Sequence, residues 1–201
     1  MSTEQHDDPD APALSAITIF TGSALGDDSA FAREARRLAE HLAREGLGVV
    51  YGGGNVGLMG VVADAARSAG GRVRGVIPEG LVRGEIAHEG LDALEIVPDM
   101  HRRKQRMNEL GDAFVALPGG AGTLEELFEM WTWQQLGFHR KPVAVYDVGG
   151  FWSPMLAMLD EMVARGFIRE SFRNRLIVAS EPDELLGKLR AWRPAAPKWG
   201  R

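Results

Sequence analysis

Short apolar runs alternate with longer amphipathic runs along most of the chain. Most of the short runs are continuously apolar, which is typical of strands that are buried on both faces of a parallel sheet. The longer runs repeat their apolar positions with the period of a helix. The predicted strands are 16–20, 48–51, 72–77, 93–97, 113–117, 142–148 and 175–179, and the predicted helices are 31–46, 58–71, 100–111, 123–137, 151–166 and 182–192.

This alternation of strand and helix predicts an α/β fold. We expect a Rossmann-like, doubly wound and mostly parallel sheet of about seven strands, with helices on both faces. Residues 1–13 are polar, acidic and proline-containing, and the last residues of the chain also lack an apolar pattern. We therefore expect a disordered N-terminal tail over 1–13, a single domain over 14–193 and a flexible C-terminal tail over 194–201.

Composition supports a single domain and excludes several classes of protein. The 201 residues are 45% hydrophobic and 25% charged, which is enough to bury a full core. There is no cysteine, and the five histidines lack metal-ligand spacing, so we predict no disulfide and no metal site. No signal peptide or membrane-spanning run is evident, which predicts a cytoplasmic protein. The net charge of -5 argues against nucleic-acid and membrane partners.

Glycine, at 25 residues, collects at the ends of the predicted strands. Three strand-to-helix turns are unusual, namely 21–23, 52–57 and 118–123. Ligands of parallel sheets bind beyond the carboxyl ends of the strands, where small residues let backbone N–H groups and a helix dipole meet an anion. Any one turn is equally compatible with close packing of strand and helix. The three together predict a site for a phosphate-bearing ligand.

The turn at 52–57 also matches a dinucleotide-binding pattern. Gly52, Gly54 and Gly57 satisfy G-x-G-x-x-G, and Glu79 lies where an acid could meet a ribose. The match falls in the second strand-helix unit rather than the first, so a nicotinamide-dependent oxidoreductase is the weaker alternative, testable by NADH fluorescence. A P-loop is excluded because no Gly-Lys-Ser/Thr follows any of these glycines.

The helix after the third turn begins with two acidic residues. Thr123 and Glu126 fit a capping box, in which Thr123 caps the helix and Glu126 folds back on it. A carboxylate one turn from a phosphate would repel that phosphate, so its presence makes better sense if Glu126 acts on the substrate. Glu125 lies about 100° around the helix and need not point the same way.

A basic cluster precedes the same strand. His101-Arg102-Arg103-Lys104 is followed by Arg106, and helical spacing places Arg103 on one face with Arg106. Such runs are usually solvated, but this helix leads directly into the strand that ends at the third glycine turn. Its start is therefore expected near the rim of the phosphate site.

Taken together, these motifs resemble the LONELY GUY (LOG) family of cytokinin riboside 5′-monophosphate phosphoribohydrolases, once labelled possible lysine decarboxylases. The family pairs an Arg-Lys dipeptide, here Arg103-Lys104, with P-G-G-x-G-T-x-x-E, here 118–126. The similarity covers most of 15–180. The label of decarboxylase finds no support, because no local motif indicates a lysine for pyridoxal phosphate.

The resemblance implies a Rossmann-like homodimer that cleaves the N-glycosidic bond of a nucleoside 5′-monophosphate, without a metal or redox cofactor. The products would be ribose 5-phosphate and a free base, either adenine from AMP or an N6-modified cytokinin base. It implies that Arg103 and Glu126 are the catalytic pair. The implied substrate-binding residues are Gly22, Ser23, Gly53, Gly54, Glu85, Lys104, Gly119, Gly120, Ala121, Gly122, Thr123, Glu125 and Thr132.

Two points in this assignment stay open. The family usually has Arg-Glu where this chain has Arg83-Gly84-Glu85, so the base-contacting role of Glu85 is the less secure one. The same glycine turns could also serve a nucleotide-binding or carrier protein without hydrolysis. Arg103 with Glu126 argues against a pure binder of anions, which gains little from a carboxylate.

Overall fold

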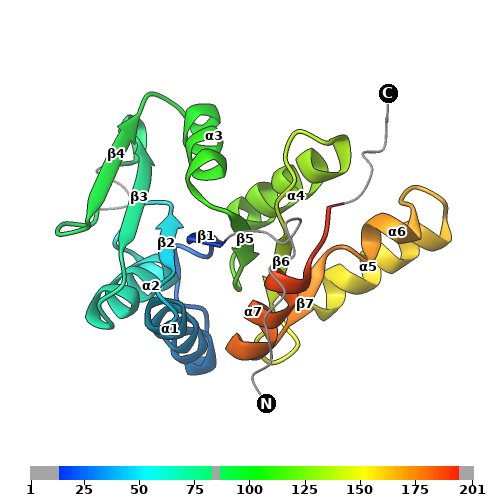
Figure 1. Cartoon of the computed structure of the whole chain (residues 1–201), viewed down its shortest axis with the longest axis horizontal. Helices are drawn as coiled ribbons and strands as arrows, with labels where there is room; N and C mark the ends of the chain where they lie inside the picture. The colour runs from blue at the N-terminus through cyan, green and yellow to red at the C-terminus, as the bar shows by residue number, and fades with distance from the viewer. Residues whose placement is uncertain (1–13, 83–86, 195–201) are drawn as a thin grey trace, which may run out of the picture.

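The computed structural model describes residues 14–82 and 87–194 (Figure 1). The tail predicted at 1–13, all but the first residue of the tail predicted at 194–201, and Glu85 lie outside the described residues. The strands are β1 (Ala16–Phe20), β2 (Gly48–Tyr51), β3 (Val73–Pro78), β4 (Ala93–Val97), β5 (Ala113–Ala116), β6 (Val143–Tyr146) and β7 (Ile177–Ala179). The helices are α1 (Ser29–Arg44), α2 (Gly57–Ser68), α3 (Met100–Leu110), α4 (Ala121–Leu136), α5 (Ser153–Ala164), α6 (Glu170–Arg173) and α7 (Pro182–Ala191), with a 3-10 turn at Glu79–Leu81.

Each predicted strand and helix overlaps an observed one, so the predicted element order is confirmed. Helix α6 was not predicted from the sequence, because its four residues are too few to show a helical period. No helix within 14–82 or 87–194 has the length and apolar character needed to span a bilayer.

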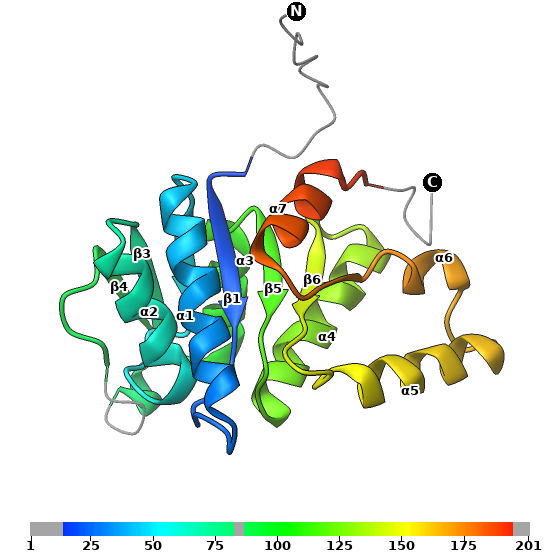
Figure 2. The ribbon, with the colours of Figure 1, turned by 90° about the horizontal axis from the view of Figure 1, so that it is seen from below.

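All seven strands are parallel and form one sheet in the order β4-β3-β2-β1-β5-β6-β7. Figure 2 shows β1, β5 and β6 side by side and pointing the same way. The strand order reverses between β1 and β5, because the chain first winds outward to β4 and then returns to the other side of β1. Such a reversal leaves a crevice at the carboxyl ends of the two central strands.

Helices cover both faces of the sheet, as predicted. On one face α1, α2 and α7 enclose a core that includes Ile17 and Val115, and on the other α3, α4 and α5 enclose a core that includes Phe114 and Ala116 (Figure 1). Neighbouring residues of one strand thus enter opposite cores. This two-sided burial explains why the strands read as continuous apolar runs.

Candidate active site

The turns after β1 and β5 are joined through their backbones. The Thr21 hydroxyl and the Gly22 N–H both donate to the carbonyl of Pro118, at 3.1 and 3.2 Å. A Cβ atom on Gly119 would lie 2.1 Å from Thr123 Oγ1 and 2.8 Å from the Gly22 nitrogen. Glycine at 119 is therefore required by the close approach of the two turns, which form one continuous surface.

Helix α4 begins three residues earlier than the capping box predicts. Its N-cap is Gly120, and no side chain caps it. Thr123 is the third residue inside the helix, and its buried side chain packs against the site of Gly119. The predicted capping box of Thr123 and Glu126 is wrong, because tight packing of the two turns places Thr123 past the helix start.

The N-terminus of α4 presents unused N–H groups. The first intrahelical bond runs from the Leu124 N–H to the Gly120 carbonyl at 3.2 Å, so the N–H groups of residues 121–123 have no acceptor within the helix. A Cβ atom on Gly120 or on Gly122 would meet nothing within 4 Å. Open space thus lies directly over the positive end of a helix, the arrangement that binds phosphate groups.

A pocket of about 320 Å³ opens at this point. It brings together the two residues predicted as catalytic, Arg103 from α3 and Glu126 from α4. Their side chains are largely buried, with exposed fractions of 5% and 9%, which is unusual for charged residues. The pocket is lined by Thr21, Gly22, Ser23, Met59, Leu81, Met100, Arg103, Gly120, Ala121, Gly122, Thr123, Glu125 and Glu126.

The guanidinium of Arg103 is oriented by main-chain carbonyls at the ends of two strands. Its Nε donates to Val76 at 3.1 Å and its Nη2 donates to Gly52 at 2.9 Å. The thioether of Met100 lies 3.7 Å from Nη1. A Cβ atom on Gly52 would lie only 2.0 Å from Nη2. Gly52 therefore makes room for Arg103. From the sequence, this glycine was expected to make room for a phosphate of the ligand instead.

Lys104 does not line the pocket. Its buried ammonium group forms ion pairs with Glu125 and, at 3.0 Å, with Glu129. Burial alone would lower the pKa of Lys104, but the hydrogen bonds and charges of the two carboxylates outweigh it and raise that pKa. Glu125 itself does line the pocket, so Lys104 acts on the site by holding Glu125.

The turn at 52–57 is not part of the pocket either. The Leu58 N–H at the start of α2 donates to the carbonyls of Gly22 and Ala24, at 3.1 and 3.4 Å. A Cβ atom on Gly57 would lie within 2.5 Å of the backbone of Ser23 and Ala24. The backbone of the turn after β1 thus occupies the space at the N-terminus of α2. A phosphate cannot bind there, so the structure does not support the dinucleotide alternative.

The other predicted binding residues are placed as follows. Gly53 packs beneath β3 and Gly54 forms a bridge with Ala87, and neither lines the pocket. Thr132 is exposed on α4 and also lies outside the pocket lining. Gly119 lines a neighbouring apolar pocket of about 260 Å³, which shares Gly22, Ser23 and Gly120 with the first.

Four lining residues were not among the predicted site residues, namely Thr21 from the first glycine turn and the apolar residues Met59, Leu81 and Met100. The two methionines lie within the segments that carry the family resemblance, but a methionine has no chemistry that would single it out in a sequence. Leu81 ends the 3-10 turn after β3. Together the methionines and Leu81 give the pocket an apolar wall.

No cluster of three or more potential metal ligands occurs in residues 14–82 and 87–194. The buried histidines have structural partners instead. His139 Nε2 lies 2.9 Å from the Met130 carbonyl, and His88 Nε2 lies 3.1 Å from Asp64 Oδ1. Burial lowers the pKa of His139 to about 4, so its ring is neutral at neutral pH.

Comparisons with known proteins agree on a family. A family model described as possible lysine decarboxylase matches residues 59–189. A probable cytokinin riboside 5′-monophosphate phosphoribohydrolase of Oryza sativa subsp. japonica is 43% identical over 182 residues, which cover 90% of this chain and 75% of the relative. A cytokinin riboside 5′-monophosphate phosphoribohydrolase of Rhodococcoides fascians is 42% identical over 181 residues, which cover 90% of this chain and 91% of the relative.

Solved structures share the fold at lower identity. The molybdenum cofactor binding protein of Rippkaea orientalis superposes with a TM-score of 0.66 at 21% identity, covering 87% of this chain and 94% of that chain. DNA processing protein A of Helicobacter pylori gives a TM-score of 0.54 at 16% identity, covering 90% of this chain and 81% of that chain. These similarities establish the sheet and its helices as a shared architecture.

Proposed function

The chain belongs to the possible lysine decarboxylase family, whose matching curated relatives are named cytokinin riboside 5′-monophosphate phosphoribohydrolases, and on this premise we propose that it is such a hydrolase. It cleaves the N-glycosidic bond of a nucleoside 5′-monophosphate to a free base and ribose 5-phosphate. The substrates we propose are AMP and N6-modified adenosine 5′-monophosphates.

The observation that carries this proposal is the content of one pocket. Open N–H groups at the start of α4, the guanidinium of Arg103 and the carboxylate of Glu126 all line it. The first is suited to a phosphate, and the other two are suited to a sugar and its glycosidic bond. A volume of about 320 Å³ lies within the usual range for small-ligand sites.

The phosphate fixes the position of the ribose. With the 5′-phosphate on the N–H groups of residues 121–123, the ribose extends toward Glu126, which lies one helical turn further along α4. Binding energy from the phosphate is thereby converted into placement of the anomeric carbon beside the carboxylate. Glycine at 120 and at 122 keeps the path of the phosphate open.

Hydrolysis passes through a sugar with oxocarbenium character. The carboxylate of Glu126 stabilises that positive charge and accepts a proton from the attacking water. Arg103 orients the ribose or Glu126 through charged hydrogen bonds, since backbone carbonyls already fix its guanidinium plane. Glu125 is paired with Lys104, which leaves the role of base to Glu126.

Lysine chemistry does not fit this pocket. The three lysines in the described part of the chain have other roles, and none of them lines the pocket. Lys104 pairs with two glutamates, Lys141 donates to the carbonyls of Asn108 and Gly111, and Lys188 pairs with Glu184. The label of lysine decarboxylase therefore has no residue here to support a Schiff base with pyridoxal phosphate.

The test is chromatographic. The purified protein is incubated with AMP and, separately, with N6-isopentenyladenosine 5′-monophosphate, and free base is quantified. We expect release of base by the wild type, and the ratio of the two rates ranks the substrates. Glu126→Gln should retain nucleotide binding and lose turnover. Equal turnover in the variant would refute the role of Glu126, and binding without release in the wild type would favour a carrier.

We also propose a cytoplasmic homodimer in which residues 14–193 of each subunit form one catalytic domain. All seven strands belong to a single sheet, which supports one domain. Phe138 is 71% exposed and, with Trp133, lines a hollow of about 410 Å³ on the outer side of α3 and α4. A large exposed aromatic side chain beside a hollow favours a protein interface, and we assign this surface to the second subunit.

A further inference from the structure

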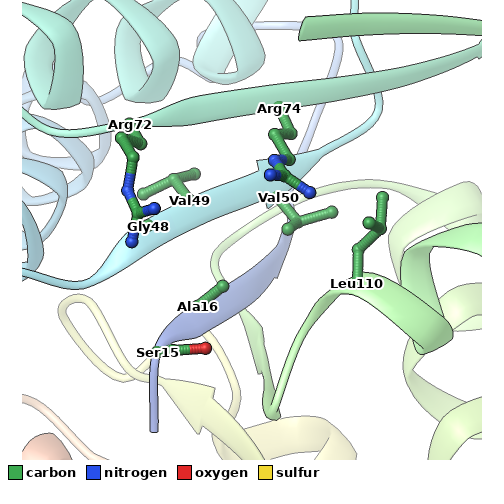
Figure 3. A pocket seen from close by; sticks show the side chains of 8 residues that line it. All are labelled: Ser15, Ala16, Gly48, Val49, Val50, Arg72, Arg74 and Leu110. Carbon is green, nitrogen blue, oxygen red and sulfur yellow. The ribbon is translucent and has the colours of Figure 1, made fainter. Parts of the chain in front are cut away.

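A small pocket lies at the amino ends of the strands, opposite the catalytic pocket. It has a volume of about 120 Å³ and is formed where β1, β2 and β3 begin. Ala16, Val50 and Leu110 supply its apolar wall, and Arg72 and Arg74 supply its polar groups. Figure 3 shows both arginine side chains reaching from β3 across β2. Arg72 directly precedes β3 and Arg74 is its second residue, so the two lie two positions apart and project from the same face.

Neither guanidinium group forms a hydrogen bond or an ion pair with any other residue in 14–82 or 87–194. The hydrogen bonds of Arg106 and, to a smaller extent, the charge of Arg74 lower the pKa of Glu95, so Arg74 is attracted to that carboxylate without bonding to it. The two nearby carboxylates already accept hydrogen bonds from other groups. Asp112 accepts from the Ser15 and Ala16 N–H groups at 2.8 and 3.0 Å, and Glu95 forms a bidentate pair with Arg106 at 2.7 and 2.9 Å.

We propose that this pocket, the Arg72–Arg74 pocket, binds a phosphoryl group, either as inorganic phosphate or as the end of a phosphate monoester. Guanidinium groups present parallel N–H donors that match phosphate oxygens, and two of them balance a dianion. The volume accepts a phosphate but leaves no room for a nucleoside, which must extend into solvent. Val50 and Leu110 line the pocket beside the two exposed arginine side chains and limit its depth.

This site is separate from the catalytic pocket. One lies at the amino ends of the strands and the other at their carboxyl ends, and no residue lines both. The five residues of β1 alone span about 16 Å. Occupancy of the Arg72–Arg74 pocket is therefore independent of the proposed hydrolysis, and either assignment can fail without the other.

The experiment follows arginine Nε–H signals in the ¹⁵N-labelled full-length protein during titration with inorganic phosphate at constant ionic strength. Signals are assigned by their loss in Arg72→Gln and Arg74→Gln. We expect the two signals to shift along a single saturable curve. Each variant should weaken the phosphate affinity reported by the remaining arginine about tenfold, because one charged hydrogen-bonding partner is lost.

Arg36 and Arg140 are the matched controls, since both are exposed and lie outside the pocket. Their signals should show only a small, unsaturable change. A titration with ribose 5-phosphate distinguishes the sources, because a monoester site saturates with it and a site for free phosphate does not. The inference is overturned if all four arginines respond alike, or if Arg72→Gln leaves the response of Arg74 unchanged while unfolding midpoints match the wild type.

Discussion

Replacing Gly52 by alanine tests whether the backbone at Gly52 fixes the position of Arg103, the arginine proposed to be catalytic. The added Cβ atom would lie 2.0 Å from Arg103 Nη2, whereas ordinary contact begins at 3.4 Å. The guanidinium must therefore withdraw by roughly 1.4 Å, which breaks its 2.9 Å bond to the Gly52 carbonyl. A misplacement of about 1 Å in a catalytic group can lower turnover about a hundredfold.

The expected loss of stability is smaller than the loss of activity. Removing a hydrogen bond to a charged group costs about 1.5–3 kcal/mol, and a glycine-to-alanine change recovers about 0.4–1 kcal/mol by restricting the unfolded chain. Urea unfolding should therefore show a loss of about 1–2 kcal/mol, with the protein still folded at 25 °C.

Kinetics with AMP or its N6-isopentenyl analogue provide the assay. Gly187→Ala is the control, because a Cβ atom there meets nothing within 4 Å and activity should not change. In a double-mutant cycle, adding Gly52→Ala to Arg103→Ala should cost no further activity, since the group that it displaces is already absent. Wild-type kcat/KM in Gly52→Ala, or full additivity in the cycle, would refute the reasoning.

Three further outcomes follow from the structure. Gly122→Ala should leave the fold intact or stabilise it by up to about 1 kcal/mol but raise KM about tenfold, because its methyl group enters the phosphate path; unchanged KM would contradict that path. Burial lowers the pKa of His139 in the folded protein to about 4, so below pH 6.5 the unfolded chain binds a proton that the folded protein does not. Between pH 6.5 and 4 the wild type should therefore lose about 3 kcal/mol more stability than His139→Gln in urea titrations. Parallel pH profiles of the two proteins would argue against this reasoning. Phe138→Asp should shift the mass measured by light scattering from dimer to monomer. A dimer of unchanged stability would show that the interface lies on another surface.

The fold could be predicted from the sequence because its physical cause is local. Each strand is buried on both sides, so each appears as an apolar run, and the rule that ligands bind at a reversal of strand order then directs attention to the ends of β1 and β5. The family motif predicted that Arg103 and Glu126 lie in one site, and both line the same pocket. Short or irregular features such as α6 leave no periodic signal.

The rest depends on contacts between distant parts of the chain. Three glycines at 52–54 look like a phosphate-binding loop. In the structure, however, Gly52 leaves space for the side chain of Arg103, and Gly57 leaves space for the backbone of the turn after β1. Lys104 follows Arg103 in sequence, but its side chain pairs with Glu125 and Glu129 outside the pocket. Local sequence cannot distinguish a glycine that faces a ligand from one that faces protein, because both require only the absence of a side chain.

The pairing of β1 with β5 also has a consequence for synthesis. The Thr21 hydroxyl donates to a carbonyl 97 residues later in the chain, so the two halves of the proposed phosphate site leave the ribosome far apart in time. At about 5–20 residues per second, the delay is on the order of 5 to 20 s. During that interval β1 can pair with β2, and β2 with β3, but the proposed phosphate site is still incomplete. On the proposed function, nucleotide can therefore stabilise the chain only after α4 has been made, and it cannot assist the earlier formation of β1 to β4.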